Sequence, residues 1–330
     1  MTTLQTRFDK QLTKIDSLLK DSQKQKNSAL WLFENDLRTP FFMLEGLARI
    51  YSKIDGSKIF NKLKQRFKTL EDILGQIDYY TQAEKTFAKN KKITAEINNY
   101  FTTNKQNALI KLGEILKLDN WYNGERIAKI KNKLSKLNTE AAEDETAALS
   151  NFYTNAINKI HAFVALTTFK FNNVEDDVHE LRRKLRWLSI YAQALQGGVK
   201  LVIHTKNNNV LKHYLTPEIK NSPYNVLPKS NPKNTALQLD KNIFYALSWL
   251  INQLGNIKDI GLNITILKEA IQASKQEINE AEALELTYKI LGPKQIKMEV
   301  LLQNVSIITA KFFKEGYLQN LLVEQNDAVK

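Results

Sequence analysis

Residues 178–191 read Val-His-Glu-Leu-Arg-Arg-Lys-Leu-Arg-Trp-Leu-Ser-Ile-Tyr, and this stretch decides the fold expected for the chain. Its apolar residues recur at intervals of three and four, as on the buried face of an α-helix. The same period runs through almost the whole sequence, which has only 11 glycines and 6 prolines in 330 residues. Leu4, Phe8 and Leu12 begin the first such stripe. The sequence therefore predicts an all-α protein with no convincing sheet.

Glycines, prolines and polar clusters place the boundaries of the expected helices. We expect helices at 4–19, 31–54, 59–87, 93–116, 121–137, up to about 171, and 174–195, with three more from residue 240 onward, the last two separated by Gly292 and Pro293. The charged stretch 138–147 is either a linker or the polar first turn of the helix that ends near 171. Residues 197–238 hold four of the six prolines and should form an irregular excursion, with one strand-like piece at 199–204.

Composition limits the classes of partner and chemistry. The chain has 48 Lys and Arg against 35 Asp and Glu, a formal net charge of +13, and no cysteine. A positive field concentrates nucleic acid, polyphosphate, other phosphorylated ligands or an anionic membrane surface, although a biased composition would give the same excess. Without cysteine, disulfides, thiolate metal sites and catalytic thiols are excluded. No apolar run approaches the roughly 20 residues of a membrane span, and no signal peptide is recognisable, so we expect a cytoplasmic protein without a transmembrane segment.

The opening stretch also carries a row of cations. At the helical period, one arc of about 100° collects His179, Arg182, Arg183 and Arg186. The apolar stripe of Leu181, Leu185 and Leu188 lies beside this arc, so the cations should be partly desolvated. Guanidinium groups offer planar forks of donors that fit phosphate oxygens. The alternative is a solvated basic face, or arginines paired with carboxylates of a neighbouring helix.

The run His179-Glu-Leu-Arg-Arg-Lys-Leu-Arg186 resembles the signature helix of the CHAD family, a histidine-containing α-helical domain. A second landmark of that family is a later helix with Leu-Gly-x-x-x-Asp after an apolar stretch. It is similar to Leu254-Gly-Asn-Ile-Lys-Asp259 in this chain, which follows Phe244-Tyr-Ala-Leu-Ser-Trp-Leu250. The resemblance covers most of residues 27–325 and rests on short motifs.

CHAD domains are internally duplicated, and the first half of this chain carries a divergent copy of both motifs. Residues 36–45 match the first landmark, with Arg38 at the place of Arg182. Residues 67–78 match the second, with Gly75 at the place of Gly255. The halves divide near residue 145, so we expect a first half at 1–145 and a second at 146–330. They form either two domains or one continuous domain.

The resemblance implies two pseudo-symmetric bundles of long helices with a basic groove between them, which bind inorganic polyphosphate or a similar polyanion. The residues expected to bind it are His179, Arg182, Arg183, Arg186, Arg38, Arg49, Lys53, Lys62, Arg66 and Lys258. The first copy departs from the family pattern, because Asn35, Thr39 and Phe42 stand where the second copy has His179, Arg183 and Arg186. Glu45 lies on the same helical face and would act against an anion.

Enzyme motifs are absent from the sequence. It has no Gly-rich phosphate loop, no His-Glu-x-x-His and no Gly-x-Ser-x-Gly, and its four histidines lack metal-ligand spacing. We therefore expect a non-enzymatic protein that needs no cofactor or metal. Two alternatives stay open: a helical scaffold whose anion site has decayed, and a nucleic-acid-binding protein. The latter would need stacking aromatics, for which Trp187 and Tyr191 are the candidates. The oligomeric state is left open.

Overall fold

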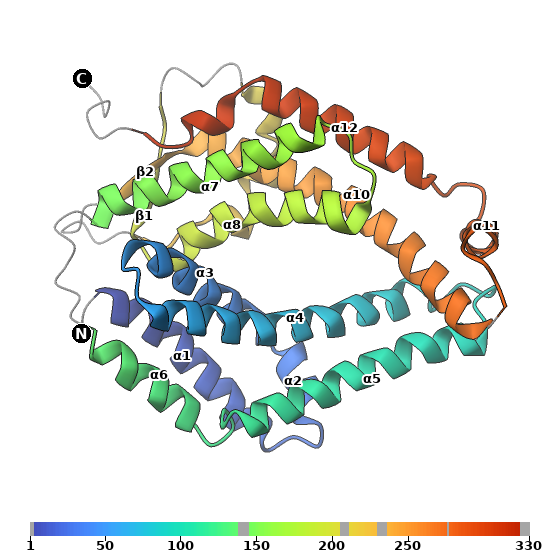
Figure 1. Ribbon diagram of the computed structural model, residues 1–330, viewed down its shortest axis with the longest axis horizontal. Coiled ribbons are helices and arrows are strands. Elements are labelled where there is room, and N and C mark those ends of the chain that lie inside the picture. Colours follow the sequence, from blue (N-terminus) through green and yellow to red (C-terminus); the bar gives the residue numbers. More distant parts are fainter. Residues whose placement is uncertain (1–2, 138–144, 205–210, 230–235, 276, 324–330) are drawn as a thin grey trace. The chain divides into compact units, whose positions relative to one another are not determined.

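The structure is a computed structural model that describes residues 3–137, 145–204, 211–229, 236–275 and 277–323. Helices make up most of these residues, which confirms the all-α expectation (Figure 1). The chain forms two compact units. The first consists of Met1–Ser52, Gly56–Ala141 and Asn263–Gln295, and the second of Lys53–Asp55, Ala142–Leu262 and Ile296–Lys330. Because residues 263–295 belong to the first unit, the units are not two uninterrupted halves of the chain.

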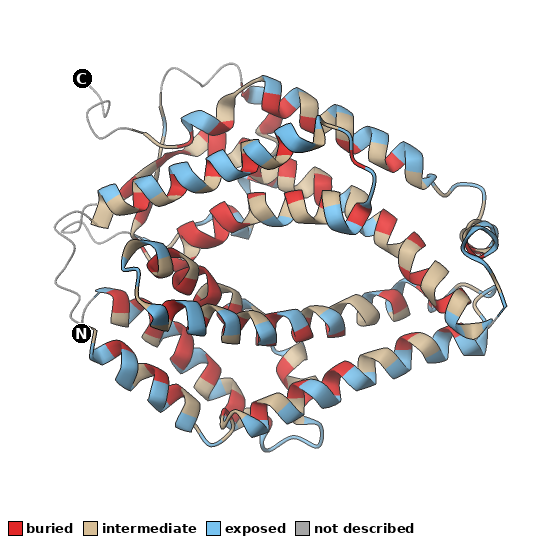
Figure 2. Ribbon diagram, in the orientation of Figure 1, coloured by how far each residue is buried: buried red, intermediate tan, exposed pale blue. Residues whose placement is uncertain are grey.

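The first unit is built mainly from six helices of the N-terminal part. They are α1 (Thr3–Ser22), α2 (Ser28–Glu34), α3 (Arg38–Ile54), α4 (Lys58–Phe87), α5 (Ala95–Leu118) and α6 (Glu125–Ser135). The long helices α4 and α5 pack against each other as an antiparallel pair, and α1 packs against α2 and α6 (Figure 1). The predicted stripe of α1 is buried, with Phe8, Leu12 and Ile15 fully inaccessible. Buried and exposed positions alternate at the helical period along these helices (Figure 2).

The prediction of one continuous helix at 31–54 is wrong, because the helical path is interrupted between α2 and α3. Asp36 adopts a left-handed conformation with φ of 58°, which ends the helical path. Its Oδ1 then accepts hydrogen bonds from the backbone N and the Oγ1 of Thr39, at 3.3 and 2.7 Å, and so caps the start of α3. The break places Arg38 at the first position of α3. A second such break, with positive φ at Asn120 and Gly124, delays the start of α6 to Glu125.

The second unit combines long helices with short elements. They are α7 (Glu145–Thr167), the π-helical turn η1 (Val174–His179), α8 (Glu180–Ala194), β1 (Val199–Val202), η3 (Lys212–Tyr214), α9 (Pro217–Lys220), η4 (Pro223–Asn225), β2 (Leu237–Asp240), α12 (Met298–Lys314) and η5 (Tyr317–Asn320). The first part of α10 (Lys241–Ser274) also belongs here, up to Leu262. α7 ends at Thr167 rather than near 171, because Thr168 and Phe169 have positive φ. Residues 138–144, where a linker or helix start was predicted, lie outside the described residues.

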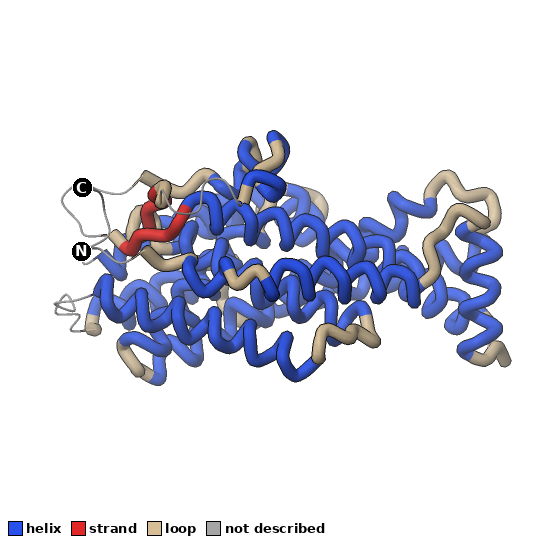
Figure 3. Tube along the Cα trace, turned by 90° about the horizontal axis from the view of Figure 1, so that it is seen from above, coloured by secondary structure: helices blue, strands red, loops and turns tan. Residues whose placement is uncertain are grey.

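Among the described residues, two strands pair in parallel to form a small sheet (Figure 3). Val199 pairs with Leu237 and Val202 with Asp240. The strand predicted at 199–204 is confirmed over Val199–Val202, whereas β2 was not predicted. Asp240 is fully buried and explains both the end of β2 and the start of α10. Its Oδ1 accepts from the backbone N of Asn242 and Ile243, and its Oδ2 accepts from the backbone N of His204.

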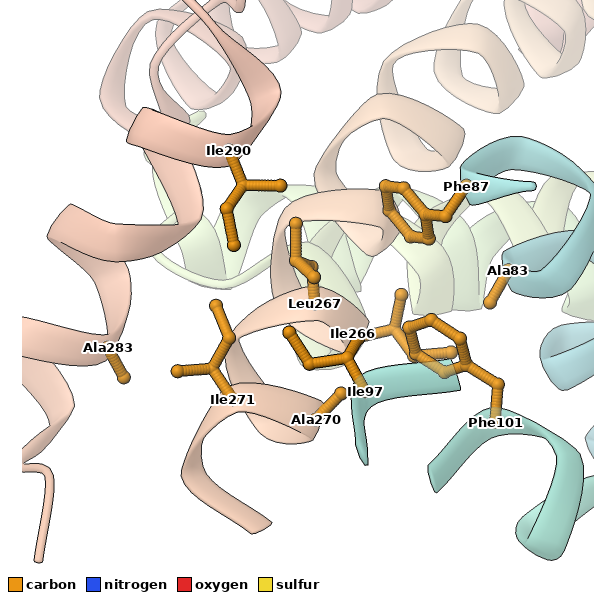
Figure 4. Packing of buried hydrophobic residues seen from close by; sticks show 10 residues of the cluster. All are labelled: Ala83, Phe87, Ile97, Phe101, Ile266, Leu267, Ala270, Ile271, Ala283 and Ile290. Carbon is orange, nitrogen blue, oxygen red and sulfur yellow. The ribbon is translucent and has the colours of Figure 1, made fainter. Parts of the chain in front are cut away.

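A separate hydrophobic cluster of the first unit joins α4 and α5 to the C-terminal part of α10 and to α11 (Glu280–Leu291). Phe87 and Phe101 stack at 5.7 Å between ring centroids, and Ile271 and Ile290 complete the cluster on the α10 and α11 side (Figure 4). α11 begins with a capping box between Asn279 and Glu282. In the described part of the chain, no helix combines the length and apolar character needed to cross a membrane.

Candidate functional site

The cation row of residues 179–186 lies in the second unit, where a π-helical turn leads into α8. Asn173 caps this turn, because its Oδ1 accepts from the backbone N of Glu175 and Asp176 at 2.7 and 3.1 Å. Asp177 Oδ2 in turn accepts from the backbone N of Asn172 and Asn173, at 2.7 and 3.0 Å. One regular helix from Val174 was expected from the sequence. The π-helical turn replaces its first part, and such turns are frequent at functional sites.

His179 ends the π-helical turn and is bonded to a carboxylate. Its Nδ1 lies 2.8 Å from Oε1 of Glu175, one turn earlier. The hydrogen bond from His179 lowers the pKa of Glu175 below its ordinary value, against the effect of burial, and the charges of Lys258 and Arg183 act in the same direction. Of the predicted site residues, His179 contacts this carboxylate, and Arg183 and Lys258 act on it through their charges. No role was predicted for Glu175, although its position four residues before His179 is a helical pairing distance.

Arg182 is held against Gly255 of α10. Its Nε donates to the backbone O of Ile251 at 3.2 Å. A Cβ atom added at Gly255 would lie 3.0 Å from Nε and 3.3 Å from Nη2 of Arg182. The glycine thus leaves the space that the half-buried guanidinium group occupies, and it explains why the second motif needs glycine at this position.

Arg38 and Gly75 have the same relationship within the first unit. A Cβ atom added at Gly75 would lie 2.8 Å from Nη2 of Arg38. In both motifs, therefore, the arginine of the first landmark lies on the glycine of the second. These are the two arginines and two glycines that were matched with each other in the sequence, and each pair makes a close contact. An internal duplication of the whole chain stays a prediction.

The two arginines differ in what surrounds them. Arg38 is bonded to two carboxylates: Nε and Nη2 lie 2.8 Å from Glu71 Oε1, and Nη1 lies 3.0 Å from Asp78 Oδ2. Ile251 of α10 stands four residues before Gly255, as Glu71 stands four residues before Gly75, and it is the backbone carbonyl of Ile251 that accepts a hydrogen bond from Arg182. Glu71 and Asp78 were not predicted as partners, although their spacing from Gly75 puts all three on one helical face.

The other predicted cations of α3 and α4 are also largely paired. Arg49 Nη2 lies 2.7 Å from Oε1 of the buried Glu45, and Arg66 Nε lies 3.3 Å from Oδ2 of Asp119. Lys53 and Lys62 are exposed and make no ion pair with a described residue. The expectation that Glu45 counteracts an anion on this face agrees with its pairing to Arg49.

Glu45 itself is in an unfavourable environment for a charge. Its side chain is 1% exposed, and its Oε2 has no hydrogen-bond partner among the described residues. Burial raises the pKa of Glu45 above its ordinary value, although the charge of Arg49 opposes this effect.

The remaining cations of the second unit have partners of their own. Arg183 and Lys184 pair with Glu180, and Lys258 pairs with the adjacent Asp259 at 2.6 Å. Lys258 is nevertheless mostly buried, with its side chain 15% exposed. Arg186 is half-buried and lies one turn after Arg182 on α8. Arg182 and Arg186 therefore lie on α8 at its border with the core, whereas Arg183, on the same segment, is exposed rather than partly desolvated as predicted.

Trp187 and Tyr191, the candidates for base stacking, are buried in the second unit. They are 8% and 6% exposed, and their rings stack on each other at 5.5 Å. Phe152 covers Tyr191 edge-on at 4.9 Å. Neither ring therefore offers a free face to a base, and both serve packing.

Among the described residues, no three His, Asp or Glu side chains are grouped so that they could hold a metal ion.

Comparisons of the chain with protein-family models, with curated proteins and with solved structures gave no match. The resemblance to the CHAD family thus rests on the motifs at 36–45, 67–78, 179–186 and 254–259.

Proposed function

We propose that the second unit binds inorganic polyphosphate or a similar phosphorylated polyanion, without enzymatic activity, through Arg182, Arg183 and Arg186 of α8. His179 and Lys258 lie at the edge of this site. The observation that carries the proposal is the position of Arg182, which Gly255 and the carbonyl of Ile251 hold half-buried in the same segment as the other two guanidinium groups.

The physical reason is the combination of charge and partial burial. Guanidinium groups bind phosphate oxygens through paired hydrogen bonds, and these bonds strengthen where water is partly excluded. A helix border next to the core provides such an environment, because apolar neighbours such as Leu181 and Leu185 are fully buried beside the row. A polyanion can also contact several cations at once, so its affinity should depend on its length and fall with salt.

The first unit is a weaker candidate. Arg38 and Arg49 pair with carboxylates that are only 11% and 1% exposed, and a phosphate would have to leave these buried groups without their partner. Arg183 also pairs with a carboxylate, that of Glu180, but its own side chain is 49% exposed, so this pair is easier to displace. We therefore restrict the proposed site to the second unit. The groove between two halves that the family resemblance implies is not needed for it.

The test is the binding of fluorescently labelled long-chain polyphosphate to the full-length protein and to the variant Arg183→Ala/Arg186→Ala. Arg182 is left in place because it also joins α8 to α10. The matched control is Lys129→Ala/Lys133→Ala, which removes the same charge from exposed positions of α6. We expect the α8 variant to bind at least about tenfold more weakly, from the loss of two charge-assisted contacts, and the control to bind within about twofold of the parent.

Competition by single-stranded DNA and measurements at two salt concentrations complete this test, and the affinity for polyphosphate should be lower at the higher salt concentration. Single-stranded DNA should compete poorly, because no stacking aromatic is accessible in this segment. Equal weakening of both variants would show a general charge effect and contradict the proposed site. Unchanged binding by the α8 variant would contradict it as well.

A helical scaffold is the second candidate function. The carboxylate pairing of Arg38, Arg49 and Arg66 favours it, because a unit with neutralised cations is suited to packing rather than to anion binding. Under this alternative, neither the parent protein nor the variants bind polyphosphate at moderate salt.

A further inference from the structure

A cavity of about 360 Å³ in the first unit lies away from the residues proposed above. It is formed by the loop before α5, the first turn of α5, the C-terminal end of α10, and α11. The residues that line it are Lys92, Thr94, Ile97, Ile271, Ser274, Lys275, Leu286, Lys289 and Ile290. Its volume falls in the lower part of the range of small-molecule sites.

The floor of this cavity is apolar. Ile97, Ile271 and Ile290 are 3%, 0% and 8% exposed and come from three different helices (Figure 4). Leu286 of α11 packs partly buried against the same cluster. Leu286 is the most accessible of these side chains, Ile97 and Ile290 are nearly buried, and Ile271 is fully buried in the cluster that supports them. Together they form an apolar base for a ligand.

Lysines form the rim. Lys92 Nζ donates to the backbone O of Lys289 at 2.7 Å, which ties the loop before α5 to the last turn of α11. Asn90 Nδ2 adds a bond to the backbone O of Ile290 at 3.3 Å. Lys289 pairs with Glu285, but both side chains are 69% exposed, so this pair competes weakly for the lysine. Lys275 makes no ion pair with a described residue.

The two hydroxyl groups at the rim already use their donor hydrogens within the protein. Thr94 caps α5, because its Oγ1 accepts from the backbone N of Ile97, and its hydroxyl is bonded to the carboxylate of Glu96. Ser274 Oγ donates to the backbone O of Ile271 at 2.9 Å. The cavity therefore joins an apolar floor to a rim where three ammonium groups are the donors for an anion.

We propose that this cavity binds a short amphiphilic anion, a compact apolar chain or ring that carries one carboxylate or phosphate group. The apolar part lies on Ile97, Ile271, Leu286 and Ile290. The anionic group lies among Lys92, Lys275 and Lys289. This site is independent of the polyanion site of the second unit, and either can exist without the other.

The test uses the full-length protein with isotope-labelled isoleucine and leucine methyl groups and titrates it with octanoate or octyl phosphate. These two probes separate a carboxylate from a phosphate ligand. Octanol and octylamine are the neutral and cationic controls of equal chain length. We expect saturable shifts of the methyl signals of Ile97, Ile271, Leu286 and Ile290, with octanoate or octyl phosphate binding at least about fivefold tighter than octanol, and octylamine weakest.

The matching variant is Lys92→Glu/Lys275→Glu, which should weaken the anion at least about tenfold and leave octanol unchanged within about twofold. Lys129→Glu/Lys133→Glu on α6 makes the same charge change outside the cavity and should bind like the parent. If the cavity variant does not fold, the order of affinities of the four probes for the parent protein decides the question. Absence of methyl shifts, octanol binding as tightly as octanoate, or equal effects of both variants would overturn the proposal.

Discussion

Arg38 lies so close to Gly75 that a methyl group at position 75 would come within 2.8 Å of its Nη2 atom. Arg182 and Gly255 repeat this relationship in the second unit, at 3.0 Å from Nε. In each unit, a glycine in the middle of a long helix makes room for an arginine from another helix. Arg38 is bonded to the carboxylates of Glu71 and Asp78, and Arg182 donates a hydrogen bond to the backbone carbonyl of Ile251.

Gly75→Ala should lower the free energy of unfolding by about 1 kcal/mol, although alanine normally stabilises a helix interior by about that amount relative to glycine. The reason is that the new methyl group must displace Arg38 from its carboxylate partners. Gly113→Ala in α5 is the control, because no atom lies within 4 Å of a Cβ atom at that position. It should stabilise the protein by roughly 0.5–1 kcal/mol. Denaturant unfolding measures both, and an equal gain from both substitutions would contradict the close contact.

Gly261→Ala should destabilise the second unit by about 1–3 kcal/mol, as expected for overpacking. A Cβ atom there would come within 2.7 Å of Cγ2 of Val174, a stiff β-branched side chain at the start of the π-helical turn. The double variant Val174→Ala/Gly261→Ala should recover part of the loss, which a double-mutant cycle quantifies. Additive effects of the two substitutions would show that these residues do not touch.

Glu45 should make the stability of the protein depend on pH. Its pKa is raised in the folded state, from the ordinary value of 4.5, mainly by burial. A raised carboxyl pKa favours folding while the group is protonated, so the free energy of unfolding should fall as pH rises from about 4.5 through the folded-state value. Glu45→Gln removes this contribution, so its stability relative to the parent should rise over the same interval. Unfolding curves at several pH values check this, and a constant difference between the two proteins would contradict it.

Glu175→Gln should strengthen polyphosphate binding by about two- to fivefold, the effect of one partly exposed charge. Glu175 is hydrogen-bonded to His179 and is influenced by the charges of Arg183 and Lys258, so under the proposal its carboxylate competes with a phosphate for these cations. Asp72→Asn is the control, because it removes one negative charge from α4, where Asp72 pairs with Lys68. Comparable effects of the two substitutions would show that the gain in affinity for polyphosphate comes from the net charge of the protein rather than from the site on α8.

Much of the helical architecture could be predicted from sequence, because apolar periodicity alone places a buried stripe. Leu4, Phe8 and Leu12 show this for α1, and all three are buried. The break between α2 and α3 was missed, because the apolar period continues through it and only Asn35 and Asp36 signal a turn. β2 was missed because its pairing with β1 joins residues far apart in the sequence, a contact that local pattern does not contain.

The candidate site could be predicted in part. The sequence motifs paired Arg38 with Arg182 and Gly75 with Gly255, but the contact of each arginine with its glycine was not predicted and comes from the structure. The carboxylate partners Glu71, Asp78 and Glu175 were not predicted, because ion pairing depends on which helix faces come together. Sequence alone therefore located the cations but not the carboxylates that Arg38 and His179 contact.

The most direct test of the α8 site is protection of arginines from a guanidinium-modifying reagent by long-chain polyphosphate, followed residue by residue with mass spectrometry. The account predicts that polyphosphate protects Arg182, Arg183 and Arg186, while the modification of Arg66 and Arg126 in the first unit is unchanged. Equal protection in both units, or no protection of the α8 arginines at a polyphosphate concentration that saturates binding, would contradict it.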